Sequence, residues 1–223
     1  TMIEPAPGGD AYALASAEGV SGATLSHVTL AGDGSQDGLW VDGDAQAVTF
    51  ARSIVRGADS GVYVTGNQSD LEVVNTNLVG NTTGMWADGA PVDVRNTIFA
   101  YNSGTGLQYD AGASPVMHAY NLYWANGSDL SPASPLPSEL FADPLFVDPS
   151  IHDYRTLDYS PVIDAGDPAD PAPGIDNRVD IGYLEQGRAM IYVDHDYCAT
   201  CPNDGLTWQV DAFDTIQDAL DQA

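Results

Sequence analysis

The sequence predicts an all-β solenoid, in which parallel strands wind into a coil and each turn hydrogen-bonds to the next. Two sets of segments that keep one period lead to this prediction. The first set starts at intervals of 23, 23 and 22 residues: GLWVDG (38–43), GVYVTG (61–66), GMWADG (84–89) and GLQYDA (106–111). The second set runs in step with the first: LSHVTLAG (25–32), FARSIVRG (50–57), VVNTNLVG (73–80), VRNTIFAY (94–101) and HAYNLYWA (118–125).

The first set is predicted to form strands because its residues alternate between two faces. Short β-like runs are separated by Gly, Asn, Asp or Ser, and no repeat has an amphipathic stretch long enough for a helix, which excludes a helical solenoid. The alternation directs two columns of side chains inward: Leu39, Val62, Met85 and Leu107, and beside them Val41, Val64, Ala87 and Tyr109.

The second set supplies two further inward columns and the bend between them. Successive coils are expected about 4.8 Å apart, so that equivalent side chains stack. Asn75 and Asn96 share the bend position with His27 and Arg52, and we expect the asparagines to adopt the left-handed conformation and their amides to bond along the axis. The columns are Leu25, Phe50, Val73 and Val94, and Leu30, Val55, Leu78 and Phe99.

Over residues 20–125 these repeats resemble the right-handed parallel β-helix of pectate-lyase-like proteins. The resemblance implies the fold. It leaves the function open, because this scaffold hosts lyases, hydrolases, epimerases, adhesins and inert stalks.

A tail that is rich in Pro and Asp follows the coils, which are predicted over 1–128. Residues 129–188 contain large apolar residues at intervals, unlike a flexible linker. The succession NLYWANG, ADPLFVDP, SPVIDAGDP and DIGYLE resembles the closing segment of secreted β-helix proteins. The resemblance implies that this tail packs on the coils and covers the end of the core, and that the protein is extracellular or at the cell surface.

Residues 189–223 resemble the opening cap of a further β-helix, a short strand followed by a loop and an amphipathic helix. Asp211 is the expected N-cap of a helix that ends with Ala223 on its apolar face. The residues assigned to capping or assembly are Ile191, Tyr192, Val193, Trp208, Phe213, Ile216 and Leu220.

This order of segments allows two interpretations. In the first, the chain is an excerpt of a longer tandem protein, cut near Gly187. In the second, residues 189–223 cap the open coil stack of another copy or of this chain, because an uncapped stack exposes unpaired strand edges. A cap at one end and an open stack at the other would build a head-to-tail filament.

The charge excludes several classes of partner. Six Lys and Arg residues oppose 32 Asp and Glu residues, for a formal net charge of −26. Nucleic-acid binding needs clustered cations, so we expect none. No apolar run approaches the length of a membrane span. The acidity is typical of a protein kept soluble in high salt, and calcium is the alternative explanation.

One outward face offers a candidate ligand site or interface. Aromatic residues one coil apart beside carboxylates could stack on successive sugar rings of a polysaccharide. The competing and simpler expectation is that residues 129–188 or a partner cover this strip. The outward residues of the face are Trp40, Tyr63, Trp86 and Gln108, flanked by Asp42, Thr65, Asp88 and Asp110.

The sequence assigns no catalytic residue. Lyases of this fold family use a basic residue, often arginine, to remove a proton. Arg52, one coil after His27, is the best-placed arginine, and no defined acid cluster pairs with it.

The calcium candidate is an acidic, turn-rich loop whose alternative interpretation is a solvated surface. Cys198 and Cys201 are expected to form a local disulfide, because one CxxC pair supplies too few ligands for zinc. Asn-x-Ser/Thr triplets at Asn67, Asn81 and Asn126 are candidate glycan acceptors. The acids of the loop are Asp164, Asp167, Asp170, Asp176 and Asp180, with Asn177 among them.

Together these features favour a structural or adhesive β-helix module that assembles with other modules. The alternative is a carbohydrate-binding protein or polysaccharide lyase that uses the aromatic face. An enzyme should show that face as an open groove with clustered Arg or His, whereas a structural module should bury it or leave it without a base.

Overall fold

The computed structural model describes residues 2–3, 13–42, 45–66, 70–110, 116–132, 134–171, 178–186, 192–193, 196–202, 212–213 and 215 of the 223-residue chain. It contains two compact units, Thr1–Gln186 and Gly187–Ala223. In the described part, no helix has the length and apolar character needed to cross a bilayer.

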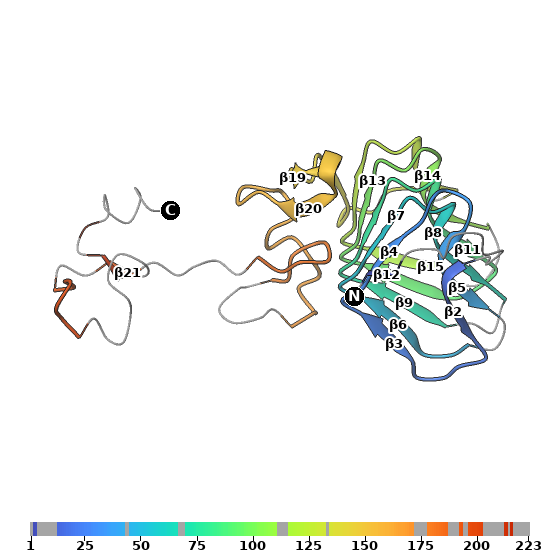
Figure 1. The fold of residues 1–223 in the computed structure, drawn as a ribbon, viewed down its shortest axis with the longest axis horizontal. Coiled ribbons are helices and arrows are strands. Elements are labelled where there is room, and N and C mark those ends of the chain that lie inside the picture. The colour runs from blue at the N-terminus through green and yellow to red at the C-terminus, as the bar shows by residue number, and fades with distance from the viewer. Residues whose placement is uncertain are drawn as a thin grey trace. The chain divides into compact units, whose positions relative to one another are not determined.

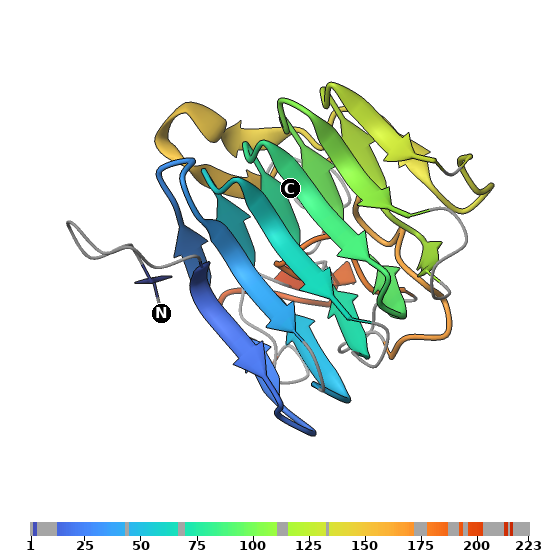
Figure 2. The ribbon, with the colours of Figure 1, turned by 90° about the vertical axis from the view of Figure 1, so that its right-hand side faces the viewer.

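The first unit is a stack of coils whose strands form three parallel sheets (Figures 1 and 2). Sheet A contains β1 (Met2–Ile3), β4 (Thr29–Ala31), β7 (Ile54–Arg56), β10 (Asn77–Val79), β13 (Ile98–Ala100), β16 (Leu122–Trp124) and β18 (Leu140–Phe141). Sheet B contains β2 (Ala13–Glu18), β5 (Asp37–Asp42), β8 (Ser60–Thr65), β11 (Thr83–Asp88), β14 (Thr105–Tyr109) and β17 (Ser128–Ser131). Sheet C contains β3 (Thr24–Ser26), β6 (Val48–Ala51), β9 (Leu71–Val74), β12 (Val92–Arg95) and β15 (Val116–Ala119).

The strand register confirms the predicted columns. In sheet B, Leu39 pairs with Val62, Val62 with Met85, and Met85 with Leu107, and all four side chains are at most 2% exposed. Residues of one kind stack because neighbouring strands are in register, so each coil depends on its neighbouring coils to bury its inward apolar residues. The other columns pair in the same way, Phe50 with Val73 in sheet C and Leu78 with Phe99 in sheet A.

The bend between sheets C and A also follows the prediction. The φ angles are +56° at His27, +47° at Arg52, +49° at Asn75 and +52° at Asn96, and Tyr120 continues the column at +53°. This left-handed conformation turns the chain sharply.

The predicted bonding between the amides of Asn75 and Asn96 is wrong. Asn75 Nδ2 donates to the carbonyl oxygen of Asp180 at 2.8 Å, and Asn96 Nδ2 donates to Asp170 Oδ2 at 2.8 Å. The two amides therefore bind the tail, because the tail places acceptors beside this bend.

The coils extend beyond residue 128, where the sequence analysis ends them. β17 pairs with β14 in sheet B, and β18 pairs with β16 in sheet A. Phe141 of β18 stacks on Tyr123, with 5.4 Å between the ring centroids. The chain thus adds to the sheets before the tail departs from them.

The tail packs on the outer face of sheet A (Figure 1). It begins with an antiparallel ribbon of β19 (Phe146–Asp148) and β20 (Asp153–Thr156), joined by the 3-10 helix η1 (Pro149–Ile151). Alternation in sheet A sends Ile54, Val79, Ile98, Ala100 and Leu122 outward, where they form one buried cluster with tail residues. The tail members are Phe146, Tyr154, Val162 and Ile181.

The second unit contains a pair of parallel strands, β21 (Tyr192–Val193) and β22 (Ala212–Phe213). The sequence analysis places Phe213 on a helix; it lies on β22 instead. Asp211, Ile191, Trp208, Ile216 and Leu220 lie outside the described residues.

Candidate functional site

The predicted outward strip is present on sheet B as an aromatic ladder. Trp40 pairs with Tyr63, Tyr63 with Trp86, and Trp86 with Gln108. We call Trp40, Tyr63 and Trp86 the aromatic ladder. All three side chains are partly buried, because each covers part of its neighbour along the stack.

The ladder is in contact with the carboxylates beside it. The Tyr63 and Trp86 rings lie 5.1 Å apart at an interplanar angle of 38°. The Tyr63 hydroxyl donates to Asp88 Oδ2 at 3.3 Å. Burial raises the pKa of Tyr63 above its ordinary value, and the negative charges of Asp88 and Asp37 raise it further. The Tyr63 hydroxyl therefore remains a neutral donor at the edge of the ladder.

Carboxylates follow the ladder along one side. Asp42 comes two residues after Trp40, and Asp88 two residues after Trp86, so that each lies on the same outer face as its aromatic residue. Asp42 pairs with Glu18 of β2, and Asp88 with Thr65 of β8. We call Glu18, Asp42 and Asp88 the acidic column. Asp110 is exposed just after β14.

Two ladder residues carry hydrogen-bond donors without an acceptor. The Nε1 atoms of Trp40 and Trp86 are enclosed and have no hydrogen-bond partner. A buried unpaired donor costs about 1–3 kcal/mol, so an acceptor that reached these indoles would be stabilised.

The described part of residues 129–188 does not cover this strip, contrary to the first of the two expectations for its covering. The tail packs on the outer face of sheet A, whereas the ladder lies on the outer face of sheet B. The reason is the position of the tail's polar partners: Asn75, Asn77 and Asn96 all lie at or next to the bend between sheets C and A. Tyr183 N donates to Asn77 Oδ1, and Asp167 N donates to Asn96 Oδ1.

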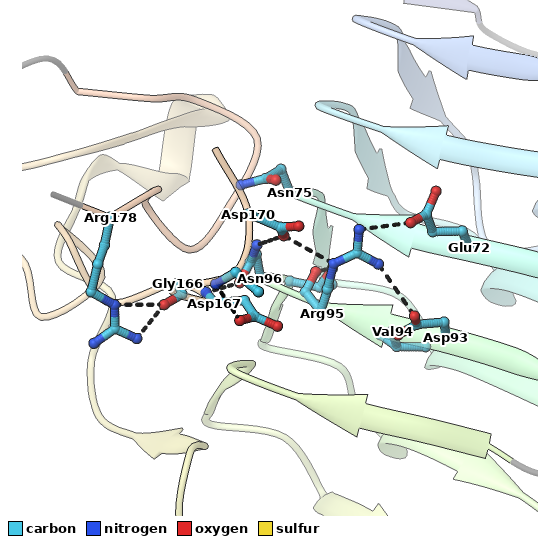
Figure 3. A network of polar contacts seen from close by, with 12 residues as sticks. Glu72, Asn75, Asp93, Val94, Arg95, Asn96, Gly166, Asp167, Asp170 and Arg178 are labelled. Carbon is cyan, nitrogen blue, oxygen red and sulfur yellow. Dashed lines mark hydrogen bonds and ion pairs between the residues drawn. The ribbon is translucent and has the colours of Figure 1, made fainter. Parts of the chain in front are cut away.

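Among the described arginines, the one with the most ion pairs lies next to that bend (Figure 3). It belongs to β12 of sheet C, whereas the ladder belongs to sheet B. Arg95 pairs with Glu72 at 2.7 Å, with Asp170 at 2.9 Å and with Asp93 at 3.3 Å. Burial disfavours its charged form, but the hydrogen bonds to Asp170 and Glu72 prevail and raise the pKa of Arg95. This guanidinium is therefore held as a cation and joins the tail to the coils.

Arg52 lies at the same bend, within the left-handed column that includes His27. In the described part of sheet B, the outward residues of the ladder and the acidic column include neither Arg nor His. The face therefore has aromatic rings and carboxylates but, among these residues, no cationic base.

The acids proposed for calcium bind protein donors in the described part of the loop. Asp170 accepts from Arg95 and Asn96, and Asp180 accepts from Asp164 N and Gln186 N. Among the residues that the structure describes, no group of three or more His, Cys, Asp or Glu side chains is arranged to hold a metal ion. Asp176 and Asn177 lie outside the described residues, so the calcium site stays a prediction.

In the second unit, a disulfide joins Cys198 and Cys201, with 5.1 Å between their Cα atoms. Tyr192 and Val193 lie on β21 and Phe213 on β22. These strands place the disulfide within the loop that connects two parallel strands.

The sequence analysis missed a ladder of buried amides. Asn102 Oδ1 accepts from Asn81 N at 3.0 Å, and Asn126 Oδ1 accepts from Asn102 N at 3.1 Å. The one-coil spacing of Asn81, Asn102 and Asn126 was visible in the sequence. Asn81 is 2% exposed and fully engaged, so glycosylation of this asparagine is incompatible with the fold. Asn67 lies outside the described residues.

A buried polar cluster at the last coil was also missed. Glu139 Oε1 lies 2.7 Å from His118 Nδ1 and accepts from the Tyr123 hydroxyl at 3.2 Å, while Glu139 Oε2 accepts from Leu136 N. His118 occupies the column of Val94, where the sequence pattern calls for an apolar residue. The cluster secures the segment that crosses the end of the core.

Comparison with solved structures identifies the fold. No family model matches the sequence, and no curated protein matches it. The crystal structure of pectate lyase Pel9A matches with a TM-score of 0.51 over 83% of this chain and 70% of that chain, at 12% sequence identity. The fold is a pectate-lyase-like parallel β-helix. At this identity the likeness shows the fold alone.

Proposed function

We propose that this β-helix is an extracellular adhesive module that binds a polysaccharide along the outer face of sheet B. The observation that supports the proposal is the aromatic ladder, which continues over three successive coils on a different side of the stack from the tail. Aromatic rings bury large apolar areas at a small cost in side-chain entropy, which makes them effective ligand contacts.

The dimensions of the ladder suit a glycan that lies parallel to the stack axis. Successive rungs are about 4.8 Å apart, comparable to the length of one sugar ring in an extended chain. The apolar face of each ring can pack on an aromatic rung, while Asp42 and Asp88 accept hydrogen bonds from hydroxyl groups along one edge of the glycan.

Binding without catalysis fits this face better than the lyase alternative. A lyase must remove a proton with a base placed at the bound sugar. Arg52, the best-placed arginine of the sequence, lies at the bend between sheets C and A, and the neighbouring Arg95 is engaged by three carboxylates. A lyase would be supported instead if glycan incubated with the protein were cleaved to unsaturated products.

Replacement of the ladder residues tests the proposal. We expect Trp40→Ala and Trp86→Ala each to lower the affinity for cellohexaose by about tenfold, as measured by titration calorimetry, because central aromatic contacts dominate binding energies. Tyr159→Ala is the matched control, since Tyr159 is an exposed aromatic residue of the tail, 75% accessible. Equal affinities for all four proteins would refute the role of the ladder.

A second proposal concerns residues 189–223, which we assign to module-to-module assembly. Tyr192 pairs in parallel with Ala212, 20 positions later. Paired residues on neighbouring strands of sheet A are 18 to 27 positions apart, as in Leu122 with Leu140 and Met2 with Thr29. The similar spacing supports a new coil that begins here, either of a following module or docked on a second copy. Strictly monomeric light scattering across concentrations would exclude the second copy.

A further inference from the structure

We propose that the acidic column beside the ladder selects a β-1,4-linked glycan whose sugars carry free amino groups. The inference rests on the proposed function of the aromatic ladder and specifies the ligand class. It is drawn from three features of sheet B: the sign of its outward charges, their register, and the unpaired donors on the same rungs.

The outward charges of the face are negative. Glu18, Asp42 and Asp88 lie along one side of the ladder, and Asp37 begins strand β5, where its carboxylate accepts from Ser60 N. In the described part of this face no Lys, Arg or His opposes them. The effect reaches the ladder itself, because Asp88 and Asp37 both raise the pKa of Tyr63. A polyuronate would be repelled here, and a polyamine attracted.

The register repeats one arrangement on alternate coils. Trp40 with Asp42 and Trp86 with Asp88 have the same two-residue offset, about 6.6 Å along a strand. On the coil between them, Tyr63 is followed by Thr65, which carries no charge. Two subsites with the same Trp–Asp pair therefore lie two coils apart, about 9.6 Å along the axis. They differ in their neighbours, because the Tyr63 hydroxyl donates to Asp88 and Glu18 pairs with Asp42.

This alternation matches the geometry of a β-1,4-linked chain. Successive rings of such a chain are turned over, so every second ring directs the same substituent to the same side. With the rings on the ladder, the amino groups of alternate sugars face Asp42 and Asp88. The amino group of the sugar between them points away from the acidic column. On that coil the position in the column is occupied by Thr65, which carries no charge.

The same two rungs hold the enclosed indole N–H groups that lack an acceptor, those of Trp40 and Trp86. A ring hydroxyl oxygen of the bound sugar can accept this proton once the indole reorients. Binding should therefore change the tryptophan fluorescence, which gives a second readout that is independent of the heat of binding.

The test compares three hexasaccharides at low salt and at a pH where amines are protonated: hexaglucosamine, cellohexaose and hexagalacturonate. We expect the protein to bind hexaglucosamine about tenfold more tightly than cellohexaose, and hexagalacturonate more weakly than either. Asp42→Asn combined with Asp88→Asn should abolish the preference for hexaglucosamine, because the loss of two charges lowers its affinity far more than that for the neutral cellohexaose.

A control variant, Asp70→Asn combined with Asp158→Asn, makes the same change in net charge at exposed carboxylates away from the acidic column. It should keep the preference. Equal affinities of the unaltered protein for hexaglucosamine and cellohexaose would overturn the inference, as would equal loss of preference in both double variants. If the inference fails but cellohexaose binding still depends on Trp40 and Trp86, the proposed function stands. If the binding of every glycan is independent of the ladder, both the inference and the proposed function are refuted.

Discussion

Buried asparagines connect consecutive coils where sheet A turns toward sheet B. Each amide uses both of its ends: Asn102 Nδ2 donates to the carbonyl oxygen of Leu78 at 3.0 Å and to Asn126 Oδ1 at 2.8 Å, and its Oδ1 accepts from Asn81 N. At this bend the backbone N–H groups of Asn81 and Asn102 bond to side-chain amides of the next coil. A stacked amide supplies these partners, because it carries a donor and an acceptor on one short side chain.

Asn102→Ala should therefore lower the free energy of unfolding by more than the removal of an exposed polar side chain would. The substitution leaves Asn81 N buried without its acceptor and removes one donor from the carbonyl oxygen of Leu78, and we expect a loss of about 1–3 kcal/mol in the free energy of unfolding. Denaturant titration followed by circular dichroism measures it. The neighbouring exposed Ser103→Ala is the control and should change stability by less than about 0.5 kcal/mol. Similar values for the two variants would show that the amide ladder contributes little.

At the scale of elements, the tail is joined to the coils by one polar network as well as by apolar packing (Figure 3). Asp170 Oδ2 accepts from Arg95 Nε at 2.9 Å and from Asn96 Nδ2 at 2.8 Å. On the other side of this loop, Arg178 donates to the carbonyl oxygen of Gly166. The side chains of Arg95 and Asp170 are 19% and 20% exposed, so their charges are screened less than those of a surface pair.

Asp170→Ala should loosen the tail and leave the coils intact. We expect a loss of about 1–3 kcal/mol, because Arg95 and Asn96 each lose an acceptor in a partly buried site. Hydrogen exchange should quicken at residues 160–171 and 178–186 and stay unchanged in β8 and β11. Asp153→Ala, which removes the exposed Arg155 ion pair, is the control and should affect neither. Uniformly faster exchange over the coils as well would mean that the tail does not open separately.

The elements divide clearly into those that the sequence predicts and those that it does not. The columns of Leu39 and Leu78 and the outward ladder of Trp40 were predictable, because a parallel stack repeats its side-chain pattern once per coil. The side on which the tail packs was not, because single long-range bonds such as Asn75 to Asp180 determine it and leave no periodic signal. The unpaired indole donors depend on side-chain orientation, which the strand pattern does not specify.

At the scale of the whole molecule, the dominant quantity is the net charge of −26. Like charges at this density repel one another, and the compact state suffers more from this repulsion than the expanded one. The Debye length falls from about 10 Å at 0.1 M salt to about 3 Å at 1 M, so salt removes most of the repulsion between exposed carboxylates. Screening and specific calcium binding would both stabilise the protein. Screening depends on the ionic strength, whereas specific binding depends on the presence of calcium itself.

We expect Tm to rise steadily between about 0.1 and 1 M NaCl, because the Debye length shortens strongly over this range. We expect CaCl2 at equal ionic strength to raise Tm by the same amount. The described carboxylates of the loop already accept protein donors, as Asp180 does from Asp164 N, so they gain little from a cation there. An additional rise in calcium, absent from Asp164→Asn combined with Asp167→Asn, would instead establish the predicted metal site. Differential scanning calorimetry distinguishes the two, because a bound ligand shifts Tm in proportion to the logarithm of its concentration above Kd, whereas screening saturates.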